Sequence, residues 1–165
     1  MKKLKQHFQQ LSNIRKALFI IFSLLTLFMI WFIFSHSAKT ATASSGDSAG
    51  LSHFTAVLIN KLFGTSYTAD DTVGYVRIFA HISEFAAFCY VFSASYESFF
   101  EKYRSPFYIS IPLTFTIAFI DEVIQIFYEG RAFQVSDILC DTLGGVLGGI
   151  CFYITLIIVY KKRKG

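Results

Sequence analysis

Four long apolar stretches constrain the fold of this chain more than any other feature. Residues 17–34 read ALFIIFSLLTLFMIWFIF and contain no charged side chain. Residues 76–100, 107–128 and 138–160 are also strongly apolar, although each contains some charged residues. A helix needs about 20 predominantly apolar residues to cross the hydrocarbon layer of a bilayer. The sequence therefore predicts an all-α integral membrane bundle of four transmembrane helices.

The composition supports this prediction. Of the 165 residues, 54% are hydrophobic, and 20 are phenylalanines. A soluble domain of this size rarely contains so much apolar surface, because water would have to solvate what the core cannot bury. We therefore expect a multi-pass protein of the cell membrane.

The basic residues predict the orientation of the bundle. Eleven of the 15 lysines and arginines lie in residues 1–16, 101–106 and 161–165, close to predicted membrane boundaries. Such a bias places these segments in the cytoplasm, so both termini are predicted to be inside. We interpret the net charge of +4 as a contribution to orientation and to contact with anionic lipids, and we expect no nucleic-acid partner. Cleavage of residues 17–34 as a signal peptide is an alternative, but their length exceeds the about 7–15 apolar residues typical of that role.

The chain is predicted to form a single membrane domain over residues 17–160, with a basic cytoplasmic lead-in at 1–16 and a basic tail at 161–165. The first outer loop opens with the polar stretch SHSAKTATASSGDS. Leu51, Phe54, Leu58 and Leu62 then recur at helical spacing. We predict an amphipathic helix over residues 47–63 that lies in the outer membrane interface, with Gly64 as its C-cap.

Charged and polar side chains gather at one end of the predicted bundle. In the predicted topology, the outer ends of the last three spans and the loop at 129–137 would bring them together at one depth. Ionisable groups within membrane segments are costly, so they usually pair, face the interior and serve a function. The candidate site residues are Arg77, His81, Glu84, Asp121, Glu122, Gln125, Arg131, Asp137 and Asp141.

Two sequence motifs resemble those of the VanZ-like family of small membrane proteins. They are RIFAHISEF at residues 77–85 and DEVIQIFYEGRAFQVSDILCDTLGGVLG at 121–148. Asp141 departs from the family pattern, in which Asn often stands before TLG. The resemblance implies a bacterial envelope protein, and the family is associated with low-level resistance to the glycopeptide teicoplanin.

The leading functional hypothesis is a polar pocket at the extracytoplasmic face that binds or processes an anionic cell-envelope component. Arg77, Asp121, Gln125, Arg131, Asp137 and Asp141 are the predicted ligand-binding residues. Candidate partners are membrane lipids, a lipid-linked cell-wall precursor or a glycopeptide. Arginine suits this role because its planar fork is always charged and binds oxyanions with two parallel hydrogen bonds.

Whether the pocket catalyses a reaction stays open at this point. In a catalytic version His81 is the general acid or base, Glu84 or Glu122 orients it, and Arg131 stabilises the developing charge. A divalent metal site is a second alternative, although no recognised ligand motif occurs, and we expect no metal and no cofactor. A third alternative is a non-catalytic structural or partner-binding protein whose charged residues form a salt-bridge network.

Overall fold

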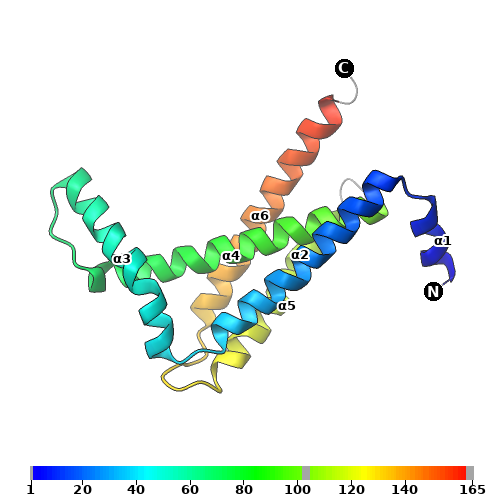
Figure 1. Cartoon of the computed structure of the whole chain (residues 1–165). Coiled ribbons are helices and arrows are strands. Elements are labelled where there is room, and N and C mark those ends of the chain that lie inside the picture. The colour runs from blue at the N-terminus through cyan, green and yellow to red at the C-terminus, as the bar shows by residue number, and fades with distance from the viewer. Residues whose placement is uncertain (1, 102–104, 163–165) are drawn as a thin grey trace.

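Six helices account for nearly all of residues 2–101 and 105–162, which are the residues that the computed structural model describes (Figure 1). In chain order they are α1 (Lys2–Gln10), α2 (Asn13–Ser37), α3 (Ala41–Phe63), α4 (Ala69–Phe100), α5 (Ser105–Gln125) and α6 (Val135–Lys162). Among these, α2, α4, α5 and α6 are long and apolar enough to cross a membrane. The predicted all-α class with four membrane-spanning helices is confirmed.

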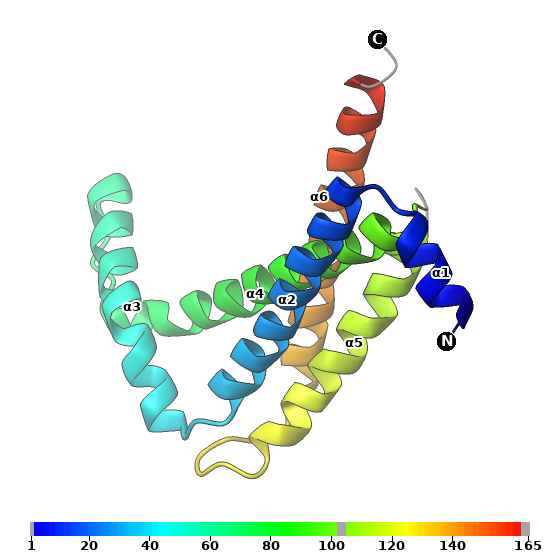
Figure 2. The same cartoon turned by 45° about the vertical axis from the view of Figure 1, so that its right-hand side comes forward.

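Helix α4 is at the centre of the bundle, where it packs against α2, α3, α5 and, most extensively, α6. Arg15 at the start of α2 pairs with Glu97 near the end of α4, so these two helices are antiparallel. Glu97 also contacts Tyr160 near the end of α6, so α4 and α6 run in the same direction. Figure 2 shows the C-terminus at the opposite end of the bundle from the loop that joins α5 to α6.

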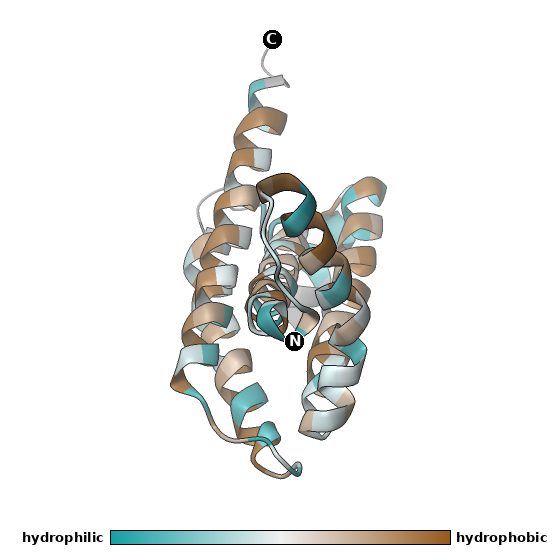
Figure 3. Cartoon of the chain, turned by 90° about the vertical axis from the view of Figure 1, so that its left-hand side faces the viewer, coloured by the Kyte–Doolittle hydropathy of each residue, from teal (hydrophilic) through white to brown (hydrophobic). Residues whose placement is uncertain are grey.

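The protein core is small, and much of the apolar surface faces outward. Buried side chains from α2, α4, α5 and α6 meet in one cluster that contains Ile33, Phe85, Phe88 and Ile117. Many other large apolar side chains are exposed, and brown hydrophobic segments dominate α6 in Figure 3. In a soluble protein such exposure would be an aggregation hazard, whereas a lipid bilayer solvates it. These features fit a multi-pass membrane protein.

Helix boundaries differ from the predicted ones at three positions that matter for the site. Helix α3 begins at Ala41 instead of residue 47, because Thr40 caps it and the Ala/Ser/Thr stretch continues the helix. Helix α5 ends at Gln125, before the predicted residue 128, so the chain turns immediately after the charged residues. Helix α6 begins at Val135, which moves Asp137 from the predicted loop into the first helical turn. Gly64 is the C-cap of α3, as predicted, with a φ of 66°.

Helix α3 crosses the first turns of α4 and projects away from the other helices (Figures 1 and 2). Its buried side consists of the small residues Ser52 and Ala56, and Thr72 of α4 donates a hydrogen bond to the Ser52 carbonyl at 2.8 Å. The predicted apolar stripe of Leu51, Phe54, Leu58 and Leu62 is exposed on α3. Its location in the membrane interface stays a prediction.

Thr68 defines where α4 begins. Its side chain accepts a hydrogen bond from the Asp71 N–H, and Asp71 accepts one in return from the Thr68 N–H, which forms a capping box. We expect Thr68→Ala to lower the free energy of unfolding by about 1 kcal/mol, because helical N–H groups lose an acceptor. Chemical denaturation in detergent would measure the change. An equal loss in Ser66→Ala, at an exposed residue outside the helix, would contradict the assignment.

Candidate functional site

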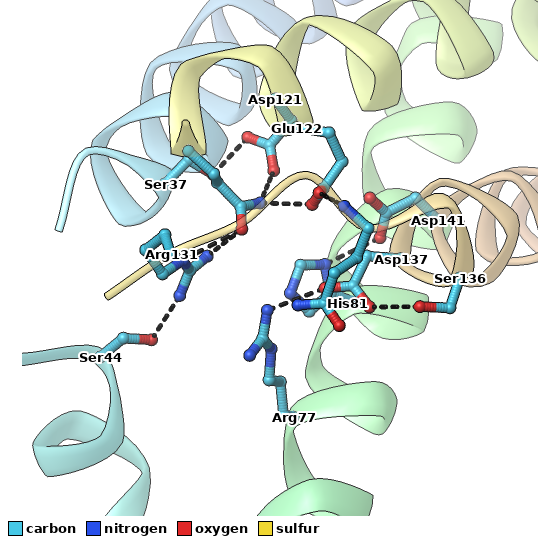
Figure 4. A network of polar contacts seen from close by, with 12 residues as sticks. Ser37, Ser44, Arg77, His81, Asp121, Glu122, Arg131, Ser136, Asp137 and Asp141 are labelled. Atoms are coloured by element: carbon cyan, nitrogen blue, oxygen red, sulfur yellow. Dashed lines mark hydrogen bonds and ion pairs between the residues drawn. The ribbon is translucent and has the colours of Figure 1, made fainter. Parts of the chain in front are cut away.

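All nine candidate site residues lie at one end of the bundle. We call this the polar end; it holds the C-termini of α2 and α5, the N-termini of α4 and α6, and the loop at 126–134. Figure 4 shows how α4, α5, α6 and the loop deliver their side chains to a common region. The site is therefore assembled from segments far apart in the sequence.

Gln125 is the centre of a buried hydrogen-bond network on α5. Its Nε2 donates to Asp121 Oδ2 at 3.1 Å and to Glu122 Oε1 at 2.6 Å. Asp121 also accepts from Ser37 Oγ at 2.5 Å, which joins the ends of α2 and α5. The second Glu122 oxygen accepts from the Gln134 backbone N–H at 2.7 Å, so Glu122 fixes the loop in front of α6. Asp121, Glu122 and Gln125 are almost fully buried.

Arg131 is bound by neutral acceptors. Its Nε and Nη2 both donate to Gln125 Oε1, at 3.0 and 2.5 Å, and its Nη1 donates to Ser44 Oγ at 3.2 Å. It forms no ion pair with any carboxylate of the described residues. Burial, and next the positive charge of Arg77, lower the pKa of the Arg131 guanidinium from its ordinary value. Arg131 is thus a fixed, partly desolvated cation close to a second one.

Helices α4 and α6 contribute two ionisable pairs. Arg77 Nη2 lies 2.8 Å from Asp137 Oδ2, and His81 Nδ1 lies 2.9 Å from Asp141 Oδ1. The partner of His81 is therefore Asp141, not Glu84 or Glu122 as expected from the sequence. With Nδ1–H donating to the carboxylate, Nε2 of a neutral His81 is an acceptor. His81 can then act as a proton acceptor, with Asp141 orienting its ring.

Two neighbouring cavities open between α3, α4 and the loop. The carboxylate cavity, about 110 Å³, is lined among others by His81, Glu84 and Asp121. The serine cavity, about 140 Å³, is lined among others by Ser45, Gly130 and Gln134. Both cavities share the same four lining residues: Ser44, Ser48, Arg77 and Arg131. Of the nine predicted residues, Glu122, Gln125, Asp137 and Asp141 do not line either cavity; they hold the residues that do.

Two buried carboxylate oxygens, Glu84 Oε1 and Asp141 Oδ2, have no hydrogen-bond partner among the described residues. Unsatisfied buried acceptors are costly, which is why they often mark sites of function. No group of three or more His, Cys, Asp or Glu residues within 2–101 and 105–162 is placed to hold a metal ion.

Four serines that line the cavities lie outside the predicted set: Ser37, Ser44, Ser45 and Ser48. Ser37 supports Asp121, and Ser44 and Ser48 line both cavities. The sequence does not single them out, because the segment after residue 34 has the composition of a polar low-complexity loop. Thr40 is the available signal, because a Thr before a run of Ala and Ser can act as an N-cap. An earlier start of α3 places Ser44 and Ser48 four residues apart on one helix face.

Comparison with known proteins identifies the family of this chain. The family model described as VanZ/LLP1 matches residues 19–158. The chain belongs to the VanZ/LLP1 family. No curated protein and no solved structure matches it.

The VanZ/LLP1 match includes most of every helix that can span the membrane and all nine candidate residues. Helix α1, whose basic sequence precedes the first span, lies outside the match. Family membership therefore concerns the membrane bundle and its polar end together.

Proposed function

We propose that this VanZ/LLP1 protein uses its polar end to bind the anionic headgroup of a bacterial cell-envelope component at the extracytoplasmic face. The family association with teicoplanin then follows from binding, because glycopeptides act at that face of the membrane. A lipid-linked cell-wall precursor and an anionic membrane lipid are the leading ligand candidates. The N-in/C-in orientation is part of this proposal, since it places the polar end outside.

The observation that carries the proposal is the environment of Arg131. A structural arginine in a membrane bundle is expected to pair with a carboxylate, because the pair reduces the cost of burial. Arg131 instead donates hydrogen bonds to Gln125 and Ser44, and it lines both cavities together with Arg77. Asp121 and Glu122 contact Arg131 only through Gln125, so its remaining N–H groups can bind an external anion.

Chemistry on the bound component would use His81 and Asp141. His81 lines the carboxylate cavity, and its Nδ1 is bound to Asp141. A neutral imidazole oriented in this way can accept a proton through Nε2. The arrangement supports general acid or base catalysis by His81 as an extension of the binding role, with Glu84 beside it in the same cavity.

A second candidate function is a non-catalytic one, in which the charged residues form a stabilising network for partner binding. The internal pairs Arg77–Asp137 and His81–Asp141 favour it, as does the extensive bonding of Gln125. The two candidates differ in what a substitution changes. Substitution of a residue that only stabilises the network lowers protein abundance. Substitution of a binding residue lowers teicoplanin tolerance at constant abundance.

Arg131→Gln and His81→Gln, made separately, should each reduce teicoplanin tolerance of a sensitive bacterial host that expresses the chain. We expect Arg131→Gln to bring tolerance to the level of the empty vector, because the variant loses the guanidinium group that would bind the anion. The minimal inhibitory concentration of teicoplanin and the membrane abundance of each variant would be measured together.

Lys61→Gln is the matched control, because it also removes one positive charge and Lys61 is an exposed residue of α3 that lines neither cavity. Wild-type tolerance in Arg131→Gln and His81→Gln at wild-type abundance would eliminate the proposal for this phenotype. A loss of abundance in both would favour the structural network.

A further inference from the structure

The side chains at the polar end indicate which class of anion the proposed site would bind. The two cavities meet at four side chains from three segments: Ser44 and Ser48 of α3, Arg77 of α4, and Arg131 of the loop. All four carry hydrogen-bond donors, and the Ser48 hydroxyl donates to the Ser44 carbonyl at 3.2 Å, a bond that it would exchange for one to an anion. Among the described residues, the serine cavity has no carboxylate in its lining. An anion placed at this junction would therefore meet donors on several sides.

Both arginines keep donors available for such an anion. Arg131 has five N–H groups, and the bonds to Gln125 and Ser44 use three of them. Arg77 uses one in its bond to Asp137, and its side chain remains 37% exposed. Ser44 Oγ accepts from Arg131, so its own O–H is free to donate. Figure 4 shows Arg131 beside Ser44, and Arg77 beside His81 and Asp137.

Two of the carboxylates near the junction, Asp47 and Asp137, form ion pairs. Asp47 lines the carboxylate cavity, but its Oδ2 lies 2.6 Å from Lys39 Nζ. Its hydrogen bond with Lys39 lowers the pKa of Asp47, so it stays ionised and paired at neutral pH. Asp121 accepts from Ser37 and Gln125, and Asp137 binds Arg77. Glu84 and Asp121 form no ion pair with a cation of the described residues, and both line the carboxylate cavity but not the serine cavity.

We infer that the junction of the two cavities is a phosphate site, formed by Arg77, Arg131, Ser44 and Ser48. A carboxylate offers two oxygens in one plane, which a single arginine fork can satisfy. A phosphate group offers three or four oxygens in tetrahedral directions, which suits donors that converge from three segments. The inference rests on the proposed function and narrows its ligand class from anions in general to phosphate esters or free phosphate.

Titration of the purified full-length chain in detergent tests the inference. The probes are inorganic phosphate, acetate, dihexanoyl phosphatidate and hexanoate, and binding is measured by calorimetry and by ³¹P line broadening. We expect at least one phosphate probe to bind at least about tenfold more tightly than its matched carboxylate, because more charged hydrogen bonds form. Binding of inorganic phosphate indicates that a free phosphate suffices, whereas binding of dihexanoyl phosphatidate alone indicates a lipid headgroup.

Variants connect the binding to the named residues. Arg131→Gln should weaken the phosphate affinity by at least about tenfold, whereas Lys61→Gln should leave it unchanged. Ser48→Ala serves as the second variant. It removes a hydroxyl that can exchange its bond to the Ser44 carbonyl for a phosphate oxygen, and it leaves Gln125 undisturbed, so the phosphate affinity should weaken by about threefold or more. Wild-type phosphate affinity in both Arg131→Gln and Ser48→Ala would overturn the inference.

The outcomes separate the inference from the proposed function. Acetate or hexanoate could bind as tightly as the phosphate probes, with binding abolished in Arg131→Gln. In that case the inference of a phosphate site fails, and the proposed function of binding an anionic headgroup stands. If no probe binds to the folded chain, both fail.

Discussion

Replacing Gly148 by alanine should destabilise the bundle by about 1–3 kcal/mol, and replacing it by leucine should prevent folding. A Cβ at Gly148 would lie 2.8 Å from the carbonyl carbon of Ala86, and still closer to its oxygen. Gly144 meets Ile82 of α4 in the same way, with the Ile82 carbonyl carbon at 3.0 Å. The obstructing atoms belong to the backbone, so no side-chain rotation relieves the clash. Only separation of α4 and α6 can do so.

Gly74→Ala is the control for this experiment. Gly74 lies within α4, on the other helix of the pair, and no atom of another segment comes within 4 Å of the place that a Cβ would take there. Alanine there should be neutral or stabilising by up to about 1 kcal/mol, because alanine favours the helix over glycine. Unfolding in mixed detergent micelles, followed by circular dichroism, would compare the two variants. Equal stability of Gly148→Ala and Gly74→Ala would contradict the close contact of α4 and α6.

The close contact of α4 and α6 also affects the ionisable pairs at the polar end. Helices α4 and α6 carry the pairs Arg77–Asp137 and His81–Asp141, which can form only if the two backbones approach closely at their N-terminal halves. Close approach through small residues four positions apart is a common way to pack helices in membranes. Gly144→Ala should therefore weaken both pairs as well as the bundle, since Gly144 lies about one turn from Asp141.

Much of this molecule could be predicted from its sequence, because hydropathy and spacing report strongly on membrane helices. The four apolar stretches correspond to four helices of the predicted type, and the glycines of LGGVLGG indicate close helix packing. The spacing of Arg77, His81 and Glu84 indicates a common face of one helix. Those features depend on local periodicity and on the cost of placing charges in lipid.

Partner choice could not be predicted in the same way. Asp141, not Glu84 or Glu122, is bound to His81, because the packing of α6 against α4 brings the Asp141 carboxylate next to the His81 ring. Ser44 reaches Arg131 because α3 starts early and its first N–H bonds the Glu129 carbonyl at 3.1 Å. These contacts join residues 60 and 87 positions apart. Periodicity within one segment carries no information about such contacts.

Replacing Gln125 by leucine should lower the free energy of unfolding by about 3–5 kcal/mol, because it leaves buried charged groups without partners. Gln125 is fully buried, and its amide contacts Arg131, Asp121 and Glu122. Leucine has a similar volume, so packing alone would predict a small effect. The loss comes from the arginine, which loses the acceptor for two of its nitrogens, and from two carboxylates that lose a donor. Denaturation in detergent, monitored by circular dichroism, would measure it.

Gln134→Leu distinguishes this network effect from a general effect of losing a glutamine at the polar end. Gln134 contacts Glu122 through its backbone N–H, at 2.7 Å, and the residue is exposed. The substitution keeps that bond, so stability should change by no more than about 0.5 kcal/mol. A small effect of Gln125→Leu would mean that water replaces the amide at Arg131. The cation would then be solvated in the free protein, and an anion would gain less by binding it.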